Sequence, residues 1–204
     1  MTFRLKPGDS LVVATHNLGK LREFQDLFAP LGVTLISSGE LGVPEPEETG
    51  ETFEENARLK AVITAFATNQ LSLSDDSGLA VDALGGAPGV HSARWAGEPR
   101  DFARAMERVE AELHAKGAIT PDARRAKFVC VLCLANQMGA VQFFEGAIDG
   151  QLIYPPRGTN GFGYDAMFVP DGYDLTFGEM DPAQKHGISH RAKAFAGLRT
   201  AVLG

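Results

Sequence analysis

A strand pattern followed at once by a helix pattern opens this chain, and that order limits the fold. Leu11–Thr15 is a short apolar run typical of a buried strand. Lys20–Phe28 then repeats its apolar residues at helical spacing, and Thr34–Ser37 forms a second short strand pattern. Strand, helix and strand in succession predict an α/β fold.

The next segments continue this alternation. An acidic loop with prolines, Gly42–Gly50, precedes a helix that begins at Thr52, because Thr52-Phe53-Glu54-Glu55 is a capping-box pattern. Leu71–Ser74 is a third strand pattern, Gly85–Gly89 is a glycine loop, and a further amphipathic helix carries its apolar residues at Phe102, Met106, Val109 and Leu113.

Two longer strands follow, and they make the sheet mixed. Lys127–Ala135 and Val141–Ile148 are separated by a connection short enough for an antiparallel hairpin. A last strand is expected at Tyr164–Val169, a turn is capped by Asp181-Pro182, and a terminal helix carries Phe195, Leu198 and Val202. The 204 residues suffice for one domain, or for two lobes that share one sheet.

Charge and hydropathy exclude several classes of protein. The formal net charge is −7, from 19 Lys and Arg against 26 Asp and Glu, which argues against a nonspecific nucleic-acid binder. No apolar run approaches the roughly 20 residues that span a bilayer, and the first residues lack the apolar core of a signal peptide. We therefore expect a cytoplasmic protein.

A C-x-x-C pair is present at Cys130 and Cys133, but it lies inside the apolar run Phe128–Leu134. Residues three apart on a strand point to opposite faces, so the pair is expected to be structural, without redox or zinc chemistry.

The segment Ser74-Asp75-Asp76-Ser77-Gly78 is the strongest candidate for chemistry. Strand alternation sends its two carboxylates to opposite faces, and Asp76 is the one expected in a polar cleft. Together with Glu47 or Glu48 from the acidic loop and substrate phosphates, Asp76 would hold a magnesium ion, and a nearby carboxylate would accept a proton from water. The alternative is an ordinary polar turn.

Three other segments suit parts of a nucleotide. Thr15–Lys20 lies at a strand-to-helix junction, where backbone N–H groups and Lys20 favour an anion; the alternative is that Asn17 is only a helix cap and Lys20 only a solvated first-turn residue. Gly158–Asp165 combines glycines with Phe162 and Tyr164, either of which could stack on a base. Lys185–Arg191 places donors near the start of the last helix, where Ser189 is alternatively a plain N-cap.

Taken together, these motifs resemble the inosine triphosphate pyrophosphatases, or Ham1-like proteins, especially the bacterial members. The resemblance runs nearly end to end and is carried by Thr15–Lys20 with Glu23, Glu47-Glu48-Thr49-Gly50 with Glu55-Asn56-Ala57, Ser74–Gly89, Ser92-Ala93-Arg94, Gly161–Asp165, and Lys185 with Ser189-His190-Arg191.

The resemblance implies a mixed, twisted central sheet with flanking helices, in a single domain spanning residues 1–204 whose two lobes surround a nucleotide cleft. It implies magnesium-dependent hydrolysis of inosine, deoxyinosine and xanthosine triphosphates to the monophosphate and pyrophosphate, by a homodimer. By the same resemblance, Asp76 is the general base and a metal ligand, and Glu47 or Glu48 is the other metal contact.

The resemblance implies more residues in contact with the substrate than with the metal. Ser77 would lie beside the substrate, and His190 and Arg191 nearest the base; His16 departs from the family pattern, which expects a small or polar residue there. The full implied set is Thr15, His16, Asn17, Leu18, Gly19, Lys20, Ser77, Phe162, Gly163, Tyr164, Asp165, Lys185, His190 and Arg191.

Selectivity would follow from donors that face purine positions 6 and 2. Adenosine presents an amino group at position 6, where inosine and xanthosine present an oxygen, and one unpaired buried group costs about 1–3 kcal/mol, or roughly 5- to 150-fold. Two other hypotheses remain open: a phosphotransferase, for which no Walker-type loop is visible, and a nucleotide sensor that binds without cleaving.

Overall fold

The computed structural model describes residues 3–202, which form two compact units, each with its own apolar core. Within the described residues, the first unit contains 3–76, 130–146 and 191–202, and the second contains 77–129 and 147–190. The helices are α1 Leu18–Phe28, α2 Phe53–Thr68, α3 Ser92–Trp95, α4 Phe102–Ala115, α5 Pro182–Ile188 and α6 His190–Val202. The strands are β1 Ser10–Val13, β2 Thr34–Ser37, β3 Ser72–Val81, β4 Arg125–Ala135, β5 Val141–Leu152 and β6 Phe168–Pro170.

The sheet is mixed, as predicted. Its strand order is β2-β1-β3-β4-β5-β6, with β1 parallel to both β2 and β3, and β5 antiparallel to β6. Strands β4 and β5 are neighbours joined by the short connection 136–140, which confirms the predicted hairpin, because parallel neighbours need a much longer crossover.

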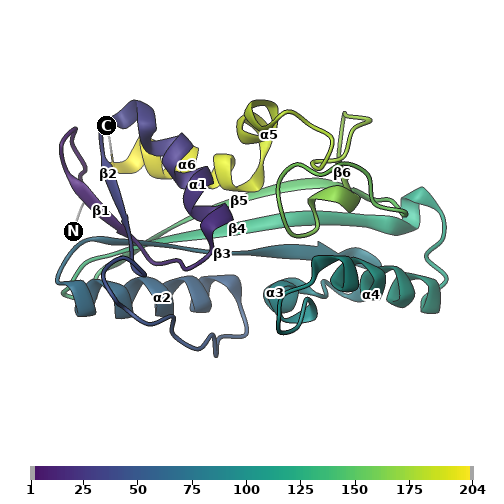
Figure 1. Cartoon of the computed structure of the whole chain (residues 1–204), viewed down its shortest axis with the longest axis horizontal. Helices are drawn as coiled ribbons and strands as arrows, with labels where there is room; N and C mark the ends of the chain where they lie inside the picture. Colours follow the sequence, from purple (N-terminus) through teal and green to yellow (C-terminus); the bar gives the residue numbers. More distant parts are fainter. Residues whose placement is uncertain (1–2, 203–204) are drawn as a thin grey trace. The chain divides into compact units, whose positions relative to one another are not determined.

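In the first unit, helices cover both faces of the sheet. Figure 1 shows α1 and α6 on one face and α2 on the other. Phe28 of α1 and Phe195 of α6 meet edge to face, with ring centroids 4.8 Å apart, over the buried strand residues Leu11, Leu73 and Leu132. The apolar residues predicted at helical spacing therefore form this core.

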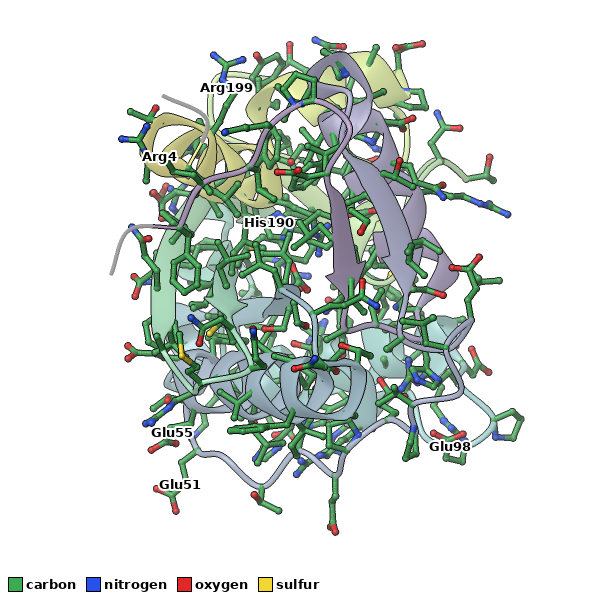
Figure 2. The ribbon with its side chains drawn as sticks, turned by 90° about the vertical axis from the view of Figure 1, so that its left-hand side faces the viewer. Arg4, Glu51, Glu55, Glu98, His190 and Arg199 are labelled. Atoms are coloured by element: carbon green, nitrogen blue, oxygen red, sulfur yellow. The ribbon has the colours of Figure 1, made fainter. Side chains whose placement is uncertain are left out.

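Helix α2 begins where the capping box predicts. The Glu55 N–H donates to the Thr52 hydroxyl, and the Thr52 N–H donates back to the Glu55 carboxylate, both at 3.1 Å. Figure 2 shows Glu51 and Glu55 at the surface. The opposite stripe of the helix, Ala57, Ala61 and Ala65, is buried against the sheet.

The second unit also has helices on both faces of its part of the sheet, with α3 and α4 on one face and α5 on the other (Figure 1). Val109 and Leu113 of α4 are buried in its core together with Phe168 of β6. The predicted cap of α5 is confirmed, because the Asp181 side chain accepts a hydrogen bond from the Ala183 N–H.

Several strand predictions were wrong in their bounds, since β1 ends at Val13 rather than Thr15 and β5 runs to Leu152 rather than Ile148. The third strand does not end at Ser74 but runs to Val81. The predicted strand Tyr164–Val169 is only Phe168–Pro170, because Asp165–Met167 forms a 3₁₀ helix. There the Asp165 carboxylate accepts the Phe162 N–H at 2.8 Å, a local bond that favours a turn over an extended chain.

Candidate active site

The carboxyl end of strand β1 lies where the connections of the sheet change from one face to the other. Its last residue, Val13, pairs with Ser37 of β2 and Leu73 of β3, and β3 continues beyond that point with Asp75 and Asp76. Helix α1, which connects β1 to β2, and α2, which connects β2 to β3, lie on opposite faces of the sheet (Figure 1). In open sheets with parallel strands, ligands bind outside the carboxyl ends of the strands at such a reversal.

Asp75 and Asp76 point to opposite faces of β3, as strand alternation predicts. Asp75 contacts Arg191 of α6 and Lys20 of α1, whereas Asp76 contacts Lys60 of α2. The segment 74–78 is therefore part of a ten-residue strand, and the alternative interpretation as a polar turn was wrong.

On the α2 face, Lys60 joins two carboxylates. Its Nζ lies 2.6 Å from Oδ1 of Asp76 and 2.6 Å from Oε1 of Glu48. The Asp76 side chain is only 6% exposed, and its Oδ2 has no hydrogen-bond partner among residues 3–202. One oxygen of Asp76 is thus held by the ammonium group while the other has no donor from the described part of the chain.

Burial controls the protonation of Asp76. Burial, with a smaller contribution from Glu48, raises the pKa of Asp76 to about 6, although Lys60 and Lys20 oppose the rise. Burial alone would lower the pKa of Lys60, but Asp76 and Glu48 raise it overall, so the ammonium stays charged. A carboxylate whose pKa lies near the working pH is suited to general-base catalysis.

The structure brings Glu48, rather than Glu47, to this cluster. Glu47 is exposed, whereas Glu48 is half-buried and contacts Lys60. Burial raises the pKa of Glu48, but the attraction of Lys60 and Lys20 outweighs this effect and lowers the pKa overall, so Glu48 stays ionised. The two carboxylates thus provide hard oxygen ligands of the kind that magnesium prefers.

On the α1 and α6 face, Asp75 belongs to a chain of alternating charges. Its Oδ1 contacts Lys20 Nζ, its Oδ2 accepts the Nε–H of Arg191 at 3.0 Å, and Arg191 in turn contacts Glu23. The Asp75 side chain has no exposed area. Burial alone would raise the pKa of Asp75, but Arg191 and Lys20 hold it well below its usual range.

Arg191 is consequently a buried residue, 2% exposed, whose contacts include two carboxylates of the protein. Its predicted contact with the base stays a prediction.

At the junction 15–20, the side chains of Thr15 and Asn17 accept hydrogen bonds from nearby backbone N–H groups. The Asn17 side chain caps α1 and accepts the N–H groups of Gly19 and Lys20 at 2.9 and 3.2 Å, while the Asn17 N–H donates to Thr15 Oγ1. His16 Nε2 lies 3.0 Å from the Val43 carbonyl oxygen, so this ring links the junction to the next loop. The Leu18 side chain is exposed, and Lys20 supplies the charge predicted for phosphate binding.

In the second unit, the structure brings together the residues predicted to bind the nucleoside. Lys185 Nζ lies 2.7 Å from Oδ2 of the buried Asp165 and 5.3 Å from the centroid of the Phe162 ring. Gly161 has a positive φ of 74°, and a Cβ there would lie 2.1 Å from Asp165 Oδ2, so only glycine fits. Ser77 and Gly163 are half-buried in the same unit.

The two aromatic rings predicted to stack on a base, Phe162 and Tyr164, differ in accessibility. Tyr164 is 2% exposed and donates to the Ser92 carbonyl oxygen at 2.8 Å, so its ring belongs to the core, whereas Phe162 is half-buried. His190, labelled in Figure 2, stacks on Phe128 with ring centroids 5.0 Å apart. Of the two predicted rings, Phe162 is therefore the more accessible one.

Sequence reasoning missed Lys60 and Cys130. Lys60 lies three residues after Ala57 and four after Asn56, both of which are buried. This spacing could have predicted that Lys60 lies on the buried side of α2. Cys130 was correctly expected in a buried strand, but its Sγ lies 3.0 Å from Oδ2 of Asp75. Neither contact is visible without the fold.

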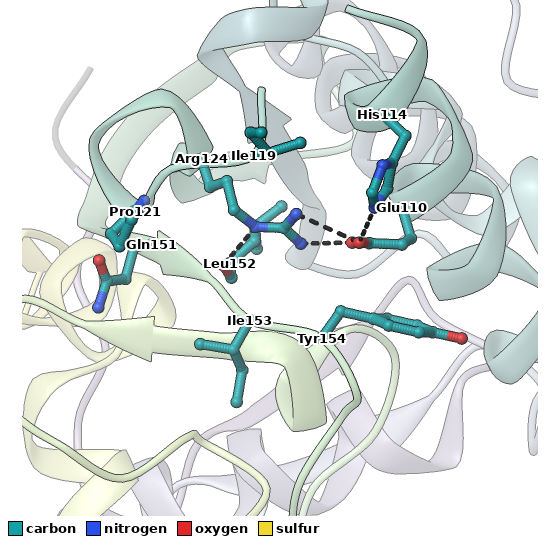
Figure 3. A pocket seen from close by; sticks show the side chains of 9 residues that line it. All are labelled: Glu110, His114, Ile119, Pro121, Arg124, Gln151, Leu152, Ile153 and Tyr154. Atoms are coloured by element: carbon teal, nitrogen blue, oxygen red, sulfur yellow. Dashed lines mark hydrogen bonds and ion pairs between the residues drawn. The ribbon is translucent and has the colours of Figure 1, made fainter. Parts of the chain in front are cut away.

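A cavity of about 330 Å³ lies elsewhere in the second unit and contains none of the predicted site residues. Figure 3 shows its polar side, where Glu110 pairs with Arg124 and lies 3.0 Å from His114 Nε2. Its lining residues are Glu110, His114, Ile119, Pro121, Arg124, Gln151, Leu152, Ile153 and Tyr154.

Comparison with known proteins decides the family. Residues 11–201 match the model of the Ham1 family. The chain belongs to the Ham1 family. Among curated Ham1 relatives, the dITP/XTP pyrophosphatase of Rhizobium meliloti is 54% identical over 206 residues, covering 96% of this chain and 96% of the relative. That of Zymomonas mobilis is 54% identical and covers 98% of this chain and 94% of the relative.

A solved Ham1 structure has a similar fold. The HAM1 protein from Coxiella burnetii is 40% identical, with a TM-score of 0.85 over 94% of this chain and 97% of that chain. The α/β fold and the family resemblance drawn from the sequence are therefore confirmed. Among residues 3–202, no helix is both long and apolar enough to cross a bilayer.

Proposed function

We propose that this chain hydrolyses non-canonical purine nucleoside triphosphates, namely ITP, dITP and XTP, to the nucleoside monophosphate and pyrophosphate. The observation that carries the proposal is the cluster in which Lys60 holds Asp76 and Glu48 at the reversal of the sheet, beside Lys20. Curated relatives that cover nearly the whole chain are named dITP/XTP pyrophosphatases.

In this proposal the first unit handles the phosphates. Lys20 attracts the polyphosphate, and Oδ2 of Asp76 accepts a proton from the attacking water while Lys60 holds Oδ1 in place. The oxygen of water bonds to phosphorus as the anhydride bond between the first and second phosphorus breaks, and pyrophosphate leaves. Removal of deaminated purines from the nucleotide pool is the role that follows.

Magnesium is the cofactor that we propose. Asp76 and Glu48 would hold it, since magnesium is commonly bound by one or two carboxylates together with substrate phosphates. Asp76 and Glu48 lie close to each other, since one oxygen of each is 2.6 Å from Lys60 Nζ, and their carboxylates supply the hard oxygen ligands that such an ion takes. When bound, the ion would offset phosphate charge and lower the pKa of a bound water.

The second unit is assigned to the nucleoside. Phe162 would stack on the base, and Lys185 and His190 would supply donors toward its oxygens, supported by the contact between Lys185 and Asp165. We further propose a single domain of two lobes, a homodimer and a cytoplasmic location, as the sequence led us to expect. Light scattering during gel filtration measures the oligomeric state directly.

The proposal is tested by measuring the release of pyrophosphate from ITP, XTP, ATP and GTP, first with magnesium and then with a chelator. We expect ITP and XTP to be cleaved and ATP to be disfavoured by roughly 5- to 150-fold for each unpaired contact. Equal rates on all four nucleotides would contradict the selectivity, and orthophosphate as the first product would contradict the cleavage position. Tight binding without turnover would indicate a sensor instead.

A further inference from the structure

The thiol of Cys130 forms part of the surroundings of the buried carboxylate of Asp75. Cys130 lies on β4, next to β3 in the sheet, and its Sγ is 3.0 Å from Oδ2 of Asp75. The same oxygen accepts the Nε–H of Arg191 at 3.0 Å, whereas Oδ1 contacts the Lys20 ammonium. The two oxygens therefore have different partners. Oδ2 accepts hydrogen bonds from Cys130 and Arg191, whereas Oδ1 contacts the Lys20 ammonium.

The direction of the hydrogen bond follows from the charges. Asp75 forms ion pairs with the cationic groups of Arg191 and Lys20, and a carboxylate in such pairs accepts hydrogen bonds. Burial and the nearby Asp75 charge raise the pKa of the Cys130 thiol well above its usual range, so the sulfur keeps its proton. Cys130 is thus a neutral donor, and its S–H group points at Oδ2.

A carboxylate rotates readily about the bond that joins it to the rest of an Asp side chain, because this torsion has broad minima. Two donors on the same oxygen restrict that rotation. With Oδ2 held by Arg191 and Cys130, Oδ1 remains directed at Lys20, whose Nζ also lies 3.5 Å from the Asp75 carbonyl oxygen. The position of the ammonium group therefore depends on how the carboxylate is oriented.

We propose that Cys130 is a positioning residue for substrate binding, which acts by fixing the Asp75 carboxylate that in turn places Lys20 for the phosphates. The inference rests on the proposed function in one respect only, namely that Lys20 binds the polyphosphate. It assigns no redox or covalent chemistry to the thiol.

Three substitutions separate donation from packing. Cys130→Ser keeps a donor, Cys130→Val fills the space without one, and Cys130→Ala does neither. If donation matters, Ser leaves the KM for ITP near the wild-type value, while Val and Ala raise KM roughly 3- to 10-fold, the range expected for one hydrogen bond, with kcat nearly unchanged. If Cys130 only packs, Val is the mildest change and Ser is harmful, which would overturn the proposal.

Cys133 provides the matched control, since it is a second buried cysteine on the same strand. Its pKa is raised by burial, but its Sγ lies 4.0 Å from the carbonyl oxygen of the adjacent Leu134, outside the cluster around Asp75. Cys133→Val and Cys133→Ser should leave KM unchanged, and an equal rise of KM at both cysteines would contradict a specific role. Thermal unfolding of every variant identifies losses due to misfolding, which lower the active fraction without changing KM.

A spectroscopic measurement tests the hydrogen bond without any reference to activity. In the Cys133→Ala protein, the infrared S–H stretching band of Cys130 should lie at lower frequency than the Cys133 band in the Cys130→Ala protein, because donation weakens the S–H bond. Coincident bands would refute donation. If no nucleotide is cleaved, the proposed function fails, but calorimetric titration with inorganic triphosphate still compares the variants in the same order.

Discussion

The Lys60 ammonium lies 2.6 Å from Oδ1 of Asp76, a carboxylate whose other oxygen has no hydrogen-bond partner in the described part of the chain. One oxygen is anchored, and the other has no donor from the described residues and can accept a proton. This asymmetry is the basis for proposing Asp76 as the general base.

Asp76→Asn should abolish most turnover while keeping the fold. The amide cannot accept the proton from water, and general-base catalysis contributes roughly 10²- to 10⁴-fold to rate. Pyrophosphate release from ITP measures the loss, and circular dichroism verifies the fold. Asp171→Asn is the control, since Asp171 is an exposed carboxylate paired with Arg125. Turnover within a factor of two of wild type in Asp76→Asn would assign the base elsewhere.

The pH dependence of kcat/KM should have an ascending limb with a midpoint near 6. This parameter reports the free enzyme, in which burial raises the pKa of Asp76 to about 6. A higher magnesium concentration should move the midpoint downward, because a cation next to Asp76 favours the carboxylate. A midpoint near 4, the ordinary value for aspartate, would contradict the effect of burial.

Stability should depend on pH through the same carboxyl group. The folded pKa of Asp76, about 6, lies above its ordinary value of 3.8, so the folded state holds the proton more tightly than the unfolded state. The stability that this group contributes is fully present below about pH 4 and is lost as the pH rises through 6. Urea unfolding from pH 4 to 7 should therefore show a steeper fall for wild type than for Asp76→Asn. Parallel curves would refute the linkage.

Lys60→Met should raise the pKa of Asp76 further, because it removes a nearby positive charge. The midpoint of kcat/KM should move above 6, and a destabilisation of about 3 kcal/mol is expected near neutral pH, as for other broken buried ion pairs. Lys127→Met, at an exposed position of β4, is the control. An unchanged midpoint would show that Lys60 does not govern the protonation of Asp76.

Glu48→Gln and Glu47→Gln form a matched pair for the metal contact. Glu48 shares Lys60 with Asp76, whereas Glu47 is exposed. Glu48→Gln should increase the magnesium concentration that gives half-maximal activity, and Glu47→Gln should leave it unchanged. Magnesium titrations at fixed ITP measure both, and the reverse outcome would move the contact to Glu47.

Arg191→Met should destabilise the protein by about 3–5 kcal/mol whether or not substrate is present, because it removes the buried positive charge that Asp75 and Glu23 share. Arg199→Met, at an exposed position of the same helix, should cost less than about 0.5 kcal/mol. Urea unfolding measures both. A stable Arg191→Met protein that has only a raised KM would favour a role confined to the substrate.

Periodicity predicted the elements well where local pattern and packing agree, as in α1, α2 and the β4–β5 hairpin. It failed at β3, since two adjacent aspartates disfavour a strand in isolation and become acceptable only when Lys20, Arg191 and Lys60 neutralise them. These partners lie far away in the chain, so no local window contains the information.

Site prediction had the same limit. Motifs and the family resemblance assigned Asp76, Lys20, Asp165 and Lys185 to the site. The structure pairs Asp165 with Lys185 and places Lys20 beside Asp75 and Asp76. It did not find Lys60, because a lysine on a helix is usually exposed and only tertiary packing makes this one 4% exposed.

Because Asp75 and Asp76 are consecutive on β3 and face opposite ways, the length of this segment matters as much as its composition. A one-residue insertion or deletion just upstream would turn every later side chain of the strand over and exchange the partners of the two aspartates. Natural variation in this stretch should therefore be confined to replacements, with insertions and deletions displaced into the flanking loops.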